Sequence, residues 1–321
     1  MLRKLKNAAR KVLKPNPTKA LHNAYFARYA KHGFREADLK TFSQFEASMT
    51  KMYHGVEKGL SYENYRPGFG KDAILKLISV MQNFAEKFDT DAFCYQTSLA
   101  CLQEYVRKNN EHGFSDADME QKIASLPGNA NAVGGTISFV PKTKEELKTL
   151  DFEAFIKDRH TIRHFSGEPV AIEDIKEAIK LAQHTPSACN RQGWKTRIVA
   201  DKKVLKTILE NQNGNRGFGQ EIDKMLVVTC DLNAFAYGRE VYQGYMDGGM
   251  YALNILYALH YMHIGSVPLS ASLSAVQDKN VRNVLGMKDS ECLVMFIGVG
   301  SYPESCLTTR SERRSAEIEV I

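Results

Sequence analysis

The stretch that decides the fold is Thr185-Pro186-Ser187-Ala188-Cys189-Asn190-Arg191-Gln192-Gly193-Trp194. Before it, residues 172–183 place apolar side chains at helical spacing, and after it residues 196–200 form a β-branched run. The order helix, polar loop, strand is therefore predicted. The loop gathers Ser, Asn and Gln side chains, which together offer hydrogen-bond donors and acceptors. Such groups suit the polar edge of a planar ring, and a plain surface turn is the alternative.

Outward from this loop, two sequence patterns divide the chain. After Asp151, helical stretches alternate with short β-branched runs. Those runs lie at residues 196–200, 225–230 and 292–299. From residue 20 to 123 the periodicity is helical throughout, and glycine and proline cluster at 127–135. The sequence predicts an α+β domain over residues 143–321, preceded by an all-helical region over residues 1–142.

Composition favours a folded protein of the cytosol. The chain has 321 residues, of which 43% are hydrophobic, enough for two compact domains. It has neither a run of about 18 uncharged apolar residues nor a secretory signal at its start. The six cysteines are scattered without zinc-ligand spacing, so reduced thiols are expected, with no disulfide framework and no metal site.

The positive charge is concentrated at the N-terminus. The formal net charge is +6, yet residues 1–35 hold ten Lys and Arg and no acid, so the rest of the chain carries −4. Residues 1–14 place Leu and Val at helical spacing among these basic side chains. Weak contact with an anionic membrane surface is one interpretation, and a helix packed on the protein body is the other. A basic arm on an acidic body does not indicate a nucleic-acid partner.

A second polar segment, Arg159-His160-Thr161-Ile162-Arg163-His164-Phe165, follows a predicted helix. Two guanidinium groups so close together repel each other and call for an anion. The phosphate of FMN carries nearly two charges and suits bidentate arginine. A solvated basic helix end is the alternative, because cations also favour the carbonyl dipole there.

These motifs, in this order, resemble the nitroreductase superfamily. Residues 159–163, followed by Pro186-Ser187 with Asn190, Gln192 and Trp194, resemble its opening. The resemblance then extends through the following motifs: Asp247-Gly248-Gly249-Met250 with Asn254 and His260 in a long central helix, His263-Ile264-Gly265-Ser266-Val267-Pro268 in the loop after it, Gly298–Pro303 at a strand end, and Arg314 before Val320. The similarity covers about 170 residues and implies a central antiparallel sheet flanked by helices.

The resemblance implies a cofactor, a reductant and an assembly. The cofactor is FMN, reduced by NADH or NADPH in a ping-pong cycle that ends on a nitro, quinone or enone-like compound. The flavin performs the hydride chemistry, so no catalytic acid or base is expected. Family members build each flavin site from two subunits, so a homodimer is expected. Its two-fold interface would use the helix carrying Met250, Leu253, Ile255, Leu256 and Leu259.

The same resemblance assigns the cofactor-binding residues. Arg159, Thr161, Arg163 and Arg314 would hold the phosphate end, with His160 nearby; Pro186, Ser187, Asn190 and Gln192 would line the flavin; Ser266, Val267 and Pro268 would lie over or beside the ring. The chain departs from the family at Gly193, where many relatives have proline. This change is expected to loosen the loop.

Other functions stay open at this stage. The helical region, with His54 and Glu57 one turn apart, resembles extensions on nitroreductase-like proteins associated with surface-polysaccharide synthesis. A specialised flavin oxidoreductase in polysaccharide tailoring is therefore one alternative. A non-catalytic interaction protein that retains the fold is another. A location at the inner face of the membrane would follow from the basic arm.

Overall fold

The computed structural model describes residues 17–62, 65–128, 133–136, 151–306, 308 and 315–321. The N-terminal part contains α2 (Pro17–His32), α3 (Phe42–Ser61), α4 (Lys71–Ala85), α5 (Phe93–Glu111) and α6 (Ala117–Ala124). The C-terminal part contains α8 (Phe152–Asp158), α9 (Ile172–Ala182), η1 (Ala188–Asn190), β1 (Trp194–Val199), α10 (Lys202–Asn211), η2 (Gly219–Glu221), β2 (Lys224–Asp231), η3 (Leu232–Ala234), α11 (Gln243–Tyr261), β3 (Ile264–Ser270), α12 (Ala275–Leu285) and β4 (Glu291–Ser301). None of these described helices is both long and apolar enough to cross a membrane.

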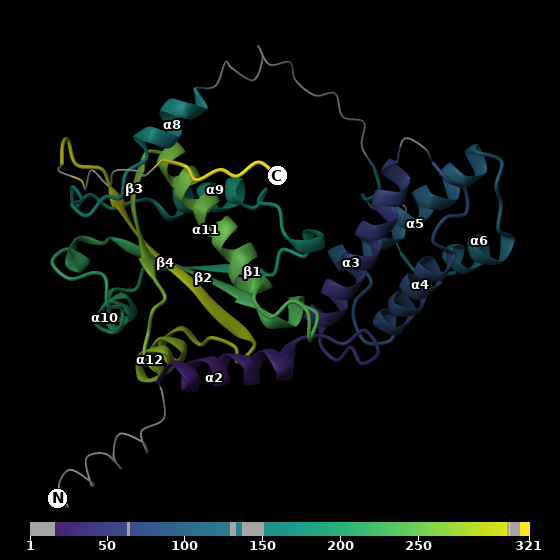
Figure 1. Cartoon of the computed structure of the whole chain (residues 1–321), viewed down its shortest axis with the longest axis horizontal. Helices are drawn as coiled ribbons and strands as arrows, with labels where there is room; N and C mark the ends of the chain where they lie inside the picture. The colour runs from purple at the N-terminus through teal and green to yellow at the C-terminus, as the bar shows by residue number, and fades with distance from the viewer. Residues whose placement is uncertain (1–16, 63–64, 129–132, 137–150, 307, 309–314) are drawn as a thin grey trace, which may run out of the picture.

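A four-stranded antiparallel sheet forms the centre of the C-terminal part (Figure 1). The strand order is β1-β2-β4-β3, so β2 and β4 are central and β1 and β3 are edges. The central strand β2 is buried along its length except for its last residue. A strand with both faces covered needs apolar side chains on both faces, which explains the continuous run Met225-Leu226-Val227-Val228.

Helices cover both faces of the sheet. Side chains of one face, including Leu226 and Val228, pack with α9 and α11. Side chains of the other face, including Met225 and Val227, pack with α10 and α12. The predicted α+β class with a helix-flanked antiparallel sheet and a helical N-terminal region is confirmed.

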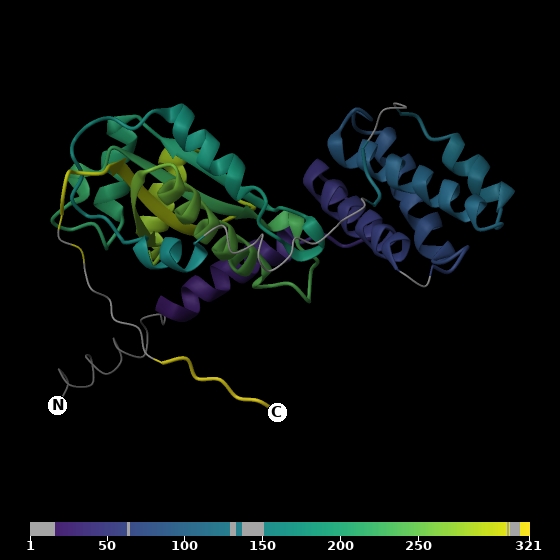
Figure 2. The same cartoon turned by 90° about the horizontal axis from the view of Figure 1, so that it is seen from above.

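Helices α3 to α6 form a separate bundle with its own core, which stands apart from the sheet in Figures 1 and 2. Its largest buried side chains include Leu60, Ile74, Leu77, Met81, Phe84 and Tyr95. Helix α3 begins at a capping box, in which Thr41 and Gln44 satisfy each other's backbone amides. His54 and Glu57 form an ion pair at 3.4 Å on this helix.

Helix α2 packs against the sheet domain although it belongs to the N-terminal part (Figure 2). Tyr29 and Phe34 lie in the same core cluster as the α11 residues. Phe34 N donates to Phe235 O at 3.1 Å, and Tyr237 N donates to Phe34 O at 3.1 Å. Residues 137–150 lie outside the described residues, so the predicted boundary between 142 and 143 stays a prediction.

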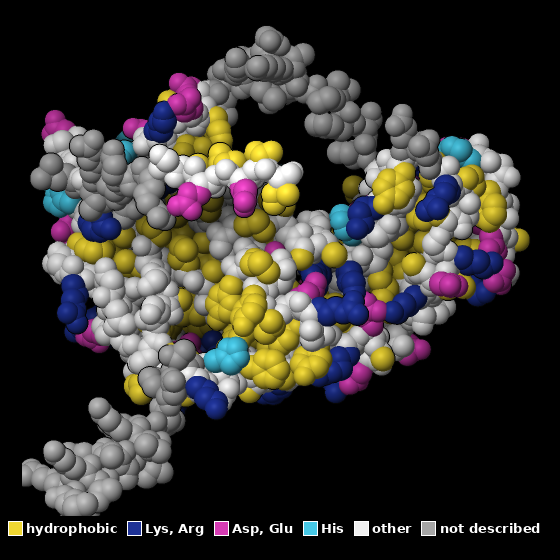
Figure 3. Space-filling model, in the orientation of Figure 1, with side chains coloured by type: hydrophobic (Ala, Val, Ile, Leu, Met, Phe, Trp, Pro, Cys, Tyr) yellow, Lys and Arg dark blue, Asp and Glu magenta, His cyan; other side chains and the backbone are white. Residues whose placement is uncertain are grey.

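Helix α11 presents two different apolar faces. Ile255, Leu256 and Leu259 are buried in the core of the single chain. The prediction that these three side chains form a two-fold interface is therefore wrong, because the sheet already covers them. Met250 and Leu253 are exposed, and Met246, Tyr245 and Tyr261 on the same helix are exposed as well. Figure 3 shows apolar side chains gathered on this side of the molecule.

Candidate flavin site

The segment that follows α8 is fixed along the edge of the sheet. Ile162 N donates to Ser266 O of β3 at 2.9 Å, and Ser166 N donates to Ser301 O of β4 at 3.1 Å. Ile162 and Phe165 are buried, whereas Arg163 between them is exposed. The sheet therefore brings residues 159–163 beside the segment of β3 that contains Ser266, Val267 and Pro268. We treat these two segments as one half of the predicted site.

Arg159 is the main cation of this half. It is half-buried, and its Nη1 is buried without a hydrogen-bond partner among the described residues. A buried guanidinium N–H without a partner is costly, so it marks a place where an acceptor is needed. Tyr302 and His260 lie close enough to interact electrostatically with Arg159, and His160 interacts in the same way with His260.

The pKa of His260 reflects the positive charges near the C-terminal end of α11. Burial lowers the pKa of His260, Asp158 opposes that effect, and the charges of Arg159, His160 and His263 lower the pKa further. The Nε2 of His260 lies 3.5 Å from Asp158 Oδ2. Excess positive charge is suited to a bound phosphate group.

The remaining predicted residues of this half lie in different positions. Thr161 is half-buried, and its carbonyl oxygen accepts a hydrogen bond from Thr308 Oγ1 at 2.9 Å. Arg314 lies outside the described residues. Ser266 and Val267 are buried and Pro268 is half-buried in strand β3. The prediction that residues 263–268 form a loop is wrong beyond His263, since β3 begins at Ile264.

The loop after α9 has an unusual backbone. Cys189, Asn190 and Gln192 have φ values of 52°, 55° and 49°. This left-handed region is uncommon for residues other than glycine and costs conformational energy for each residue. Three such residues within four positions persist only where the surroundings hold them, which is typical of functional loops.

Side-chain hydrogen bonds hold this loop. Ser187 Oγ accepts from Gln192 N at 3.0 Å, and Gln192 Nε2 donates to Asn190 O at 3.1 Å. Gln183 Nε2 donates to Gln192 Oε1 at 2.9 Å, and Gln183 Oε1 accepts from Trp194 Nε1 at 3.0 Å. The polar side chains expected to line a flavin are thus already linked to one another.

The loop borders an open groove of about 720 Å³ beside α9. Its lining includes Ile179, Gln183, Thr185, Pro186, Asn190 and Gln192. Pro186 and Asn190 are exposed there, and Ser187 is half-buried. Three of the four predicted flavin-lining residues therefore lie on one accessible surface.

Gly193 is held tightly. A Cβ atom at Gly193 would lie 2.8 Å from Ala234 Cβ and 3.1 Å from the Phe235 ring. Its carbonyl oxygen accepts from Asp231 N at 2.8 Å. The expectation that this departure loosens the loop is not supported, because the absent side chain lets the loop approach η3 closely.

The two halves of the predicted site lie toward opposite ends of α11. Ala188 N donates to Asp247 Oδ2 at 3.2 Å near its beginning, and His260 contacts Asp158 near its end. The helix rises 1.5 Å per residue, so Asp247 and His260 are separated by about 20 Å. Within one subunit, residues 159–163 and 187–192 therefore do not converge on one point.

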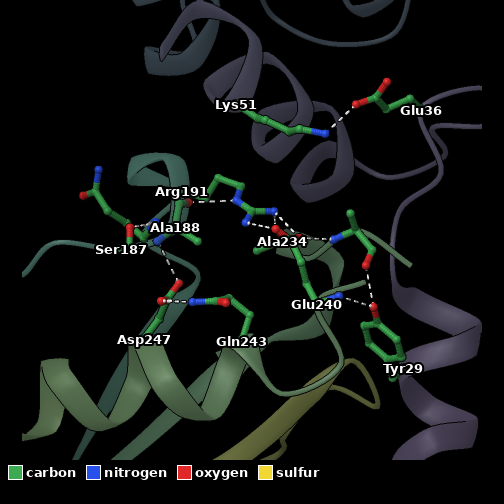
Figure 4. A network of polar contacts seen from close by, with 12 residues as sticks. Tyr29, Glu36, Lys51, Ser187, Ala188, Arg191, Ala234, Glu240, Gln243 and Asp247 are labelled. Atoms are coloured by element: carbon green, nitrogen blue, oxygen red, sulfur yellow. Dashed lines mark hydrogen bonds and ion pairs between the residues drawn. The ribbon is translucent and has the colours of Figure 1, made fainter. Parts of the chain in front are cut away.

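Sequence reasoning missed an ion pair beside the loop whose arginine is buried and whose glutamate is half-buried. The side chain of Arg191 is fully buried and donates to both carboxylate oxygens of Glu240, at 2.7 and 2.6 Å (Figure 4). Burial opposes ionisation of Glu240, but hydrogen bonds from Arg191 and the Ala236 amide outweigh it and lower its pKa. Burial raises the pKa of Asp247, which accepts from Gln243 and Ala188. The sequence carries no signal that pairs residues 49 positions apart.

Comparisons with known proteins identify similar sequences. The model of the "Nitroreductase family" matches residues 156–215, which contain both polar segments. The chain is 30% identical over 152 residues to a "Putative NADH dehydrogenase/NAD(P)H nitroreductase" of Archaeoglobus fulgidus, covering 46% of this chain and 83% of that protein. It is also 30% identical over 139 residues to an iodotyrosine deiodinase of Thermotoga neapolitana, covering 35% of this chain and 69% of that protein.

A solved structure described as an FMN-dependent nitroreductase from Clostridium difficile superposes with a TM-score of 0.43 at 20% identity, covering 50% of this chain and 92% of that chain. The family assignment depends on the sequence relatives. Because the first of them is aligned over most of its own length at 30% identity, the chain belongs to the nitroreductase family.

Proposed function

We propose that this protein is an FMN-dependent oxidoreductase, reduced by NADH or NADPH and reoxidised by a small nitro, quinone or enone-like molecule. The single observation that carries the proposal is Arg159, whose buried Nη1 has no partner among the described residues. A phosphate group supplies the missing acceptor and the negative charge. The names of the relatives, which include a chloronitrobenzene nitroreductase of Comamonas testosteroni, support the reaction class.

The residues present fit FMN. Arg159, Thr161 and Arg163, with His160 nearby and Arg314 from the C-terminal segment, would hold its phosphate. The groove beside α9 offers Asn190 and Gln192 to the polar edge of the ring. Bound FMN supplies hydride transfer, and the protein contributes binding and orientation. Among the described residues, no cluster of side chains fits a metal ion.

We further propose a homodimer in which each flavin site uses both subunits. The separation of the two halves along α11 supports this arrangement, because a second subunit could bring its loop to the first subunit's arginines. Met250 and Leu253 are 43% and 45% exposed, which leaves an apolar stripe uncovered on α11. Ile318, Val320 and Ile321 at the C-terminus are also exposed and could pack on a partner.

An absorption spectrum and mass spectrometry of the released ligand test the cofactor. The purified protein should be yellow, and the ligand should be non-covalent FMN. A colourless protein that does not bind added FMN would contradict the proposal. Stopped-flow reduction with NADH and with NADPH identifies the reductant, and light scattering tests the assembly. A monomer of about 36 kDa that keeps its flavin would exclude the shared site.

The place of the protein in the cell is a separate proposal. We propose a cytoplasmic protein with weak, salt-reversible contact between residues 1–14 and anionic membranes. These residues lie outside the described residues, so their charge is the only support. Deletion of residues 1–18 should abolish sedimentation with anionic vesicles at low salt without altering flavin reduction. Equal recovery of both proteins in the supernatant would exclude the contact.

A further inference from the structure

The ion pair between buried Arg191 and half-buried Glu240 lies at the strained part of the loop. Arg191 lies between Asn190 and Gln192, both of which have positive φ. Its guanidinium donates to Ala188 O through Nε and to Ala234 O through Nη1, each at 2.9 Å. The same side chain therefore ties the η1 turn to the η3 turn, across the loop that reaches the groove (Figure 4).

Glu240 extends these contacts to helix α2. One of its carboxylate oxygens also accepts from Ala236 N at 2.6 Å. Its own amide donates to Tyr29 Oη at 3.2 Å, and that hydroxyl donates to Ala236 O. Tyr29 is buried, with 1% of its surface exposed. Helix α2 thus supports the backbone of Glu240, whose carboxylate fixes Arg191.

We infer that Arg191 and Glu240 are positioning residues that hold residues 187–192 in the shape that receives the flavin, and that Tyr29 supports them. The inference rests on the proposed function, because it assigns a purpose to the loop at that site. Neither side chain needs to touch the flavin. Arginine is required because its planar guanidinium donates to both oxygens of one carboxylate and to two separate carbonyls. These four hydrogen bonds exceed the three donors of a lysine ammonium.

A second ion pair provides a matched control. Arg197 on β1 donates to both oxygens of Glu291 on β4, at 2.6 and 2.7 Å, and Glu291 is 2% exposed. The chemistry and distances match those of Arg191 and Glu240. The side chains of this second pair contact Thr229 and Lys195 of the sheet and the amide of Lys288, and none of these residues belongs to the loop. Weakening either pair should lower stability, but only the first should change the flavin site.

The experiment compares Arg191→Lys and Glu240→Gln with Arg197→Lys and Glu291→Gln. Three quantities are measured: the FMN dissociation constant by fluorescence titration, the visible circular dichroism of bound flavin, and amide exchange of the peptide over residues 186–195 in flavin-free protein. Thermal midpoints show how far each variant loses stability. The double variant Arg191→Glu with Glu240→Arg tests whether restoring opposite charges restores binding.

In the Arg191 and Glu240 variants, we expect the dissociation constant to rise about tenfold, the flavin dichroism to change and the loop peptide to exchange faster. The Arg197 and Glu291 variants should keep wild-type binding and loop exchange. Tyr29→Phe should accelerate amide exchange near Ala236. Tyr25 lies on the same helix as Tyr29, and its hydroxyl donates to Val241 O. Tyr25→Phe should therefore leave amide exchange near Ala236 unchanged.

Equal effects of the two sets of variants would overturn the inference and leave only structural ion pairs. Unchanged loop exchange in Arg191→Lys would overturn it too. If wild-type protein binds no FMN, the proposed function fails, but loop exchange in flavin-free protein still decides whether Arg191 positions the loop. If Arg191→Lys does not fold, Glu240→Gln and Tyr29→Phe provide the same readouts.

Discussion

The segment 159–166 and the loop 187–192 both belong to the predicted flavin site, yet they are built in opposite ways. The first is anchored by its backbone to β3 and β4, and the Nη1 of its Arg159 lacks a hydrogen-bond partner among the described residues. The second has a strained backbone, and its polar side chains bond to one another. Binding of an anion to a guanidinium N–H without a partner contributes favourable free energy. A loop whose polar groups already bond to one another contributes little. The first segment should therefore supply affinity and the second orientation.

Arg159→Ala tests whether the segment 159–166 supplies affinity for FMN, and its expected effect is the largest. Loss of a charge-assisted contact should weaken FMN binding by about 1.5–3 kcal/mol. The free energy of unfolding of flavin-free protein should not fall, because the variant removes a buried N–H without a partner. Arg163→Ala should weaken binding in the same range. Titration against Arg216→Ala, an exposed arginine outside both segments, provides the control. Unchanged affinity for FMN in Arg159→Ala would contradict the assignment of affinity to the segment 159–166.

Gly193→Ala tests how tightly the loop is seated. The added methyl would lie 2.8 Å from Ala234 Cβ, so the free energy of unfolding should fall by about 1–3 kcal/mol. Urea denaturation measures it. Gly55→Ala on α3 is the matched control, since nothing lies within 4 Å of its Cβ position. That variant should gain about 0.5–1 kcal/mol from helix propensity. Equal stability of the two variants would show that the loop can move aside.

Ser187→Ala removes one internal bond of the loop. The amide of Gln192 then loses its acceptor at 3.0 Å, and stability should fall by about 1 kcal/mol. Ser61→Ala removes an exposed hydroxyl that bonds Lys58 O at the end of α3 and should change stability by less than about 0.5 kcal/mol. A larger loss of FMN affinity in Ser187→Ala than in Arg159→Ala would reverse the assignment of affinity and orientation.

The smallest effect concerns pH. Burial, followed by the nearby cations, lowers the pKa of His260 in the folded protein, whereas an unfolded histidine titrates near pH 6.5. The unfolded chain therefore binds the proton first, so stability is present above about pH 6.5 and declines as pH falls toward the folded pKa. His260→Gln should flatten this decline in flavin-free protein. Denaturation curves from pH 7.5 to 5.5 that coincide for both proteins would contradict it.

The phosphate of bound FMN should raise the pKa of His260, opposite to the effect of burial and the nearby cations. Its negative charge favours protonated His260, so FMN should bind more tightly as pH falls through the same window. Titrations at several pH values measure this effect, and His260→Gln should reduce it.

Most elements with a clear period were predictable, and β3 was not. The β-branched runs correctly located β1, β2 and β4. Within β3, Gly265 and Pro268 argue against a strand, because glycine packs poorly and proline lacks an amide. The sheet tolerates Pro268 because β3 is an edge strand. Edge position is a property of the topology, which the local sequence does not contain.

The residue types of the candidate site were predictable from the sequence, but the contacts that hold them in place were not. The polar segments were located from residue types alone, since phosphate and flavin demand recognisable donors and acceptors. Arg191 stands in the same loop, yet it pairs with Glu240, which lies 49 positions later in the chain, beyond β1 and β2. Likewise, Gly193 could not be interpreted without η3 beside it. Contacts between distant segments decide whether such residues are loose, exposed or fixed.

Helix α2 has a consequence for the order in which the protein is completed. It is synthesised before the sheet domain, but Arg28 bonds Asp278, 250 residues later, and Tyr25 bonds Val241, 216 residues later. The bundle of α3 to α6 has its own core and can fold in between. We expect chains ending at residue 142 to hold a protease-resistant bundle while α2 is cleaved. Protection of α2 in such chains would contradict this order. In the full chain, a helix that leaves the ribosome before the sheet domain would be among the last elements to reach its final position.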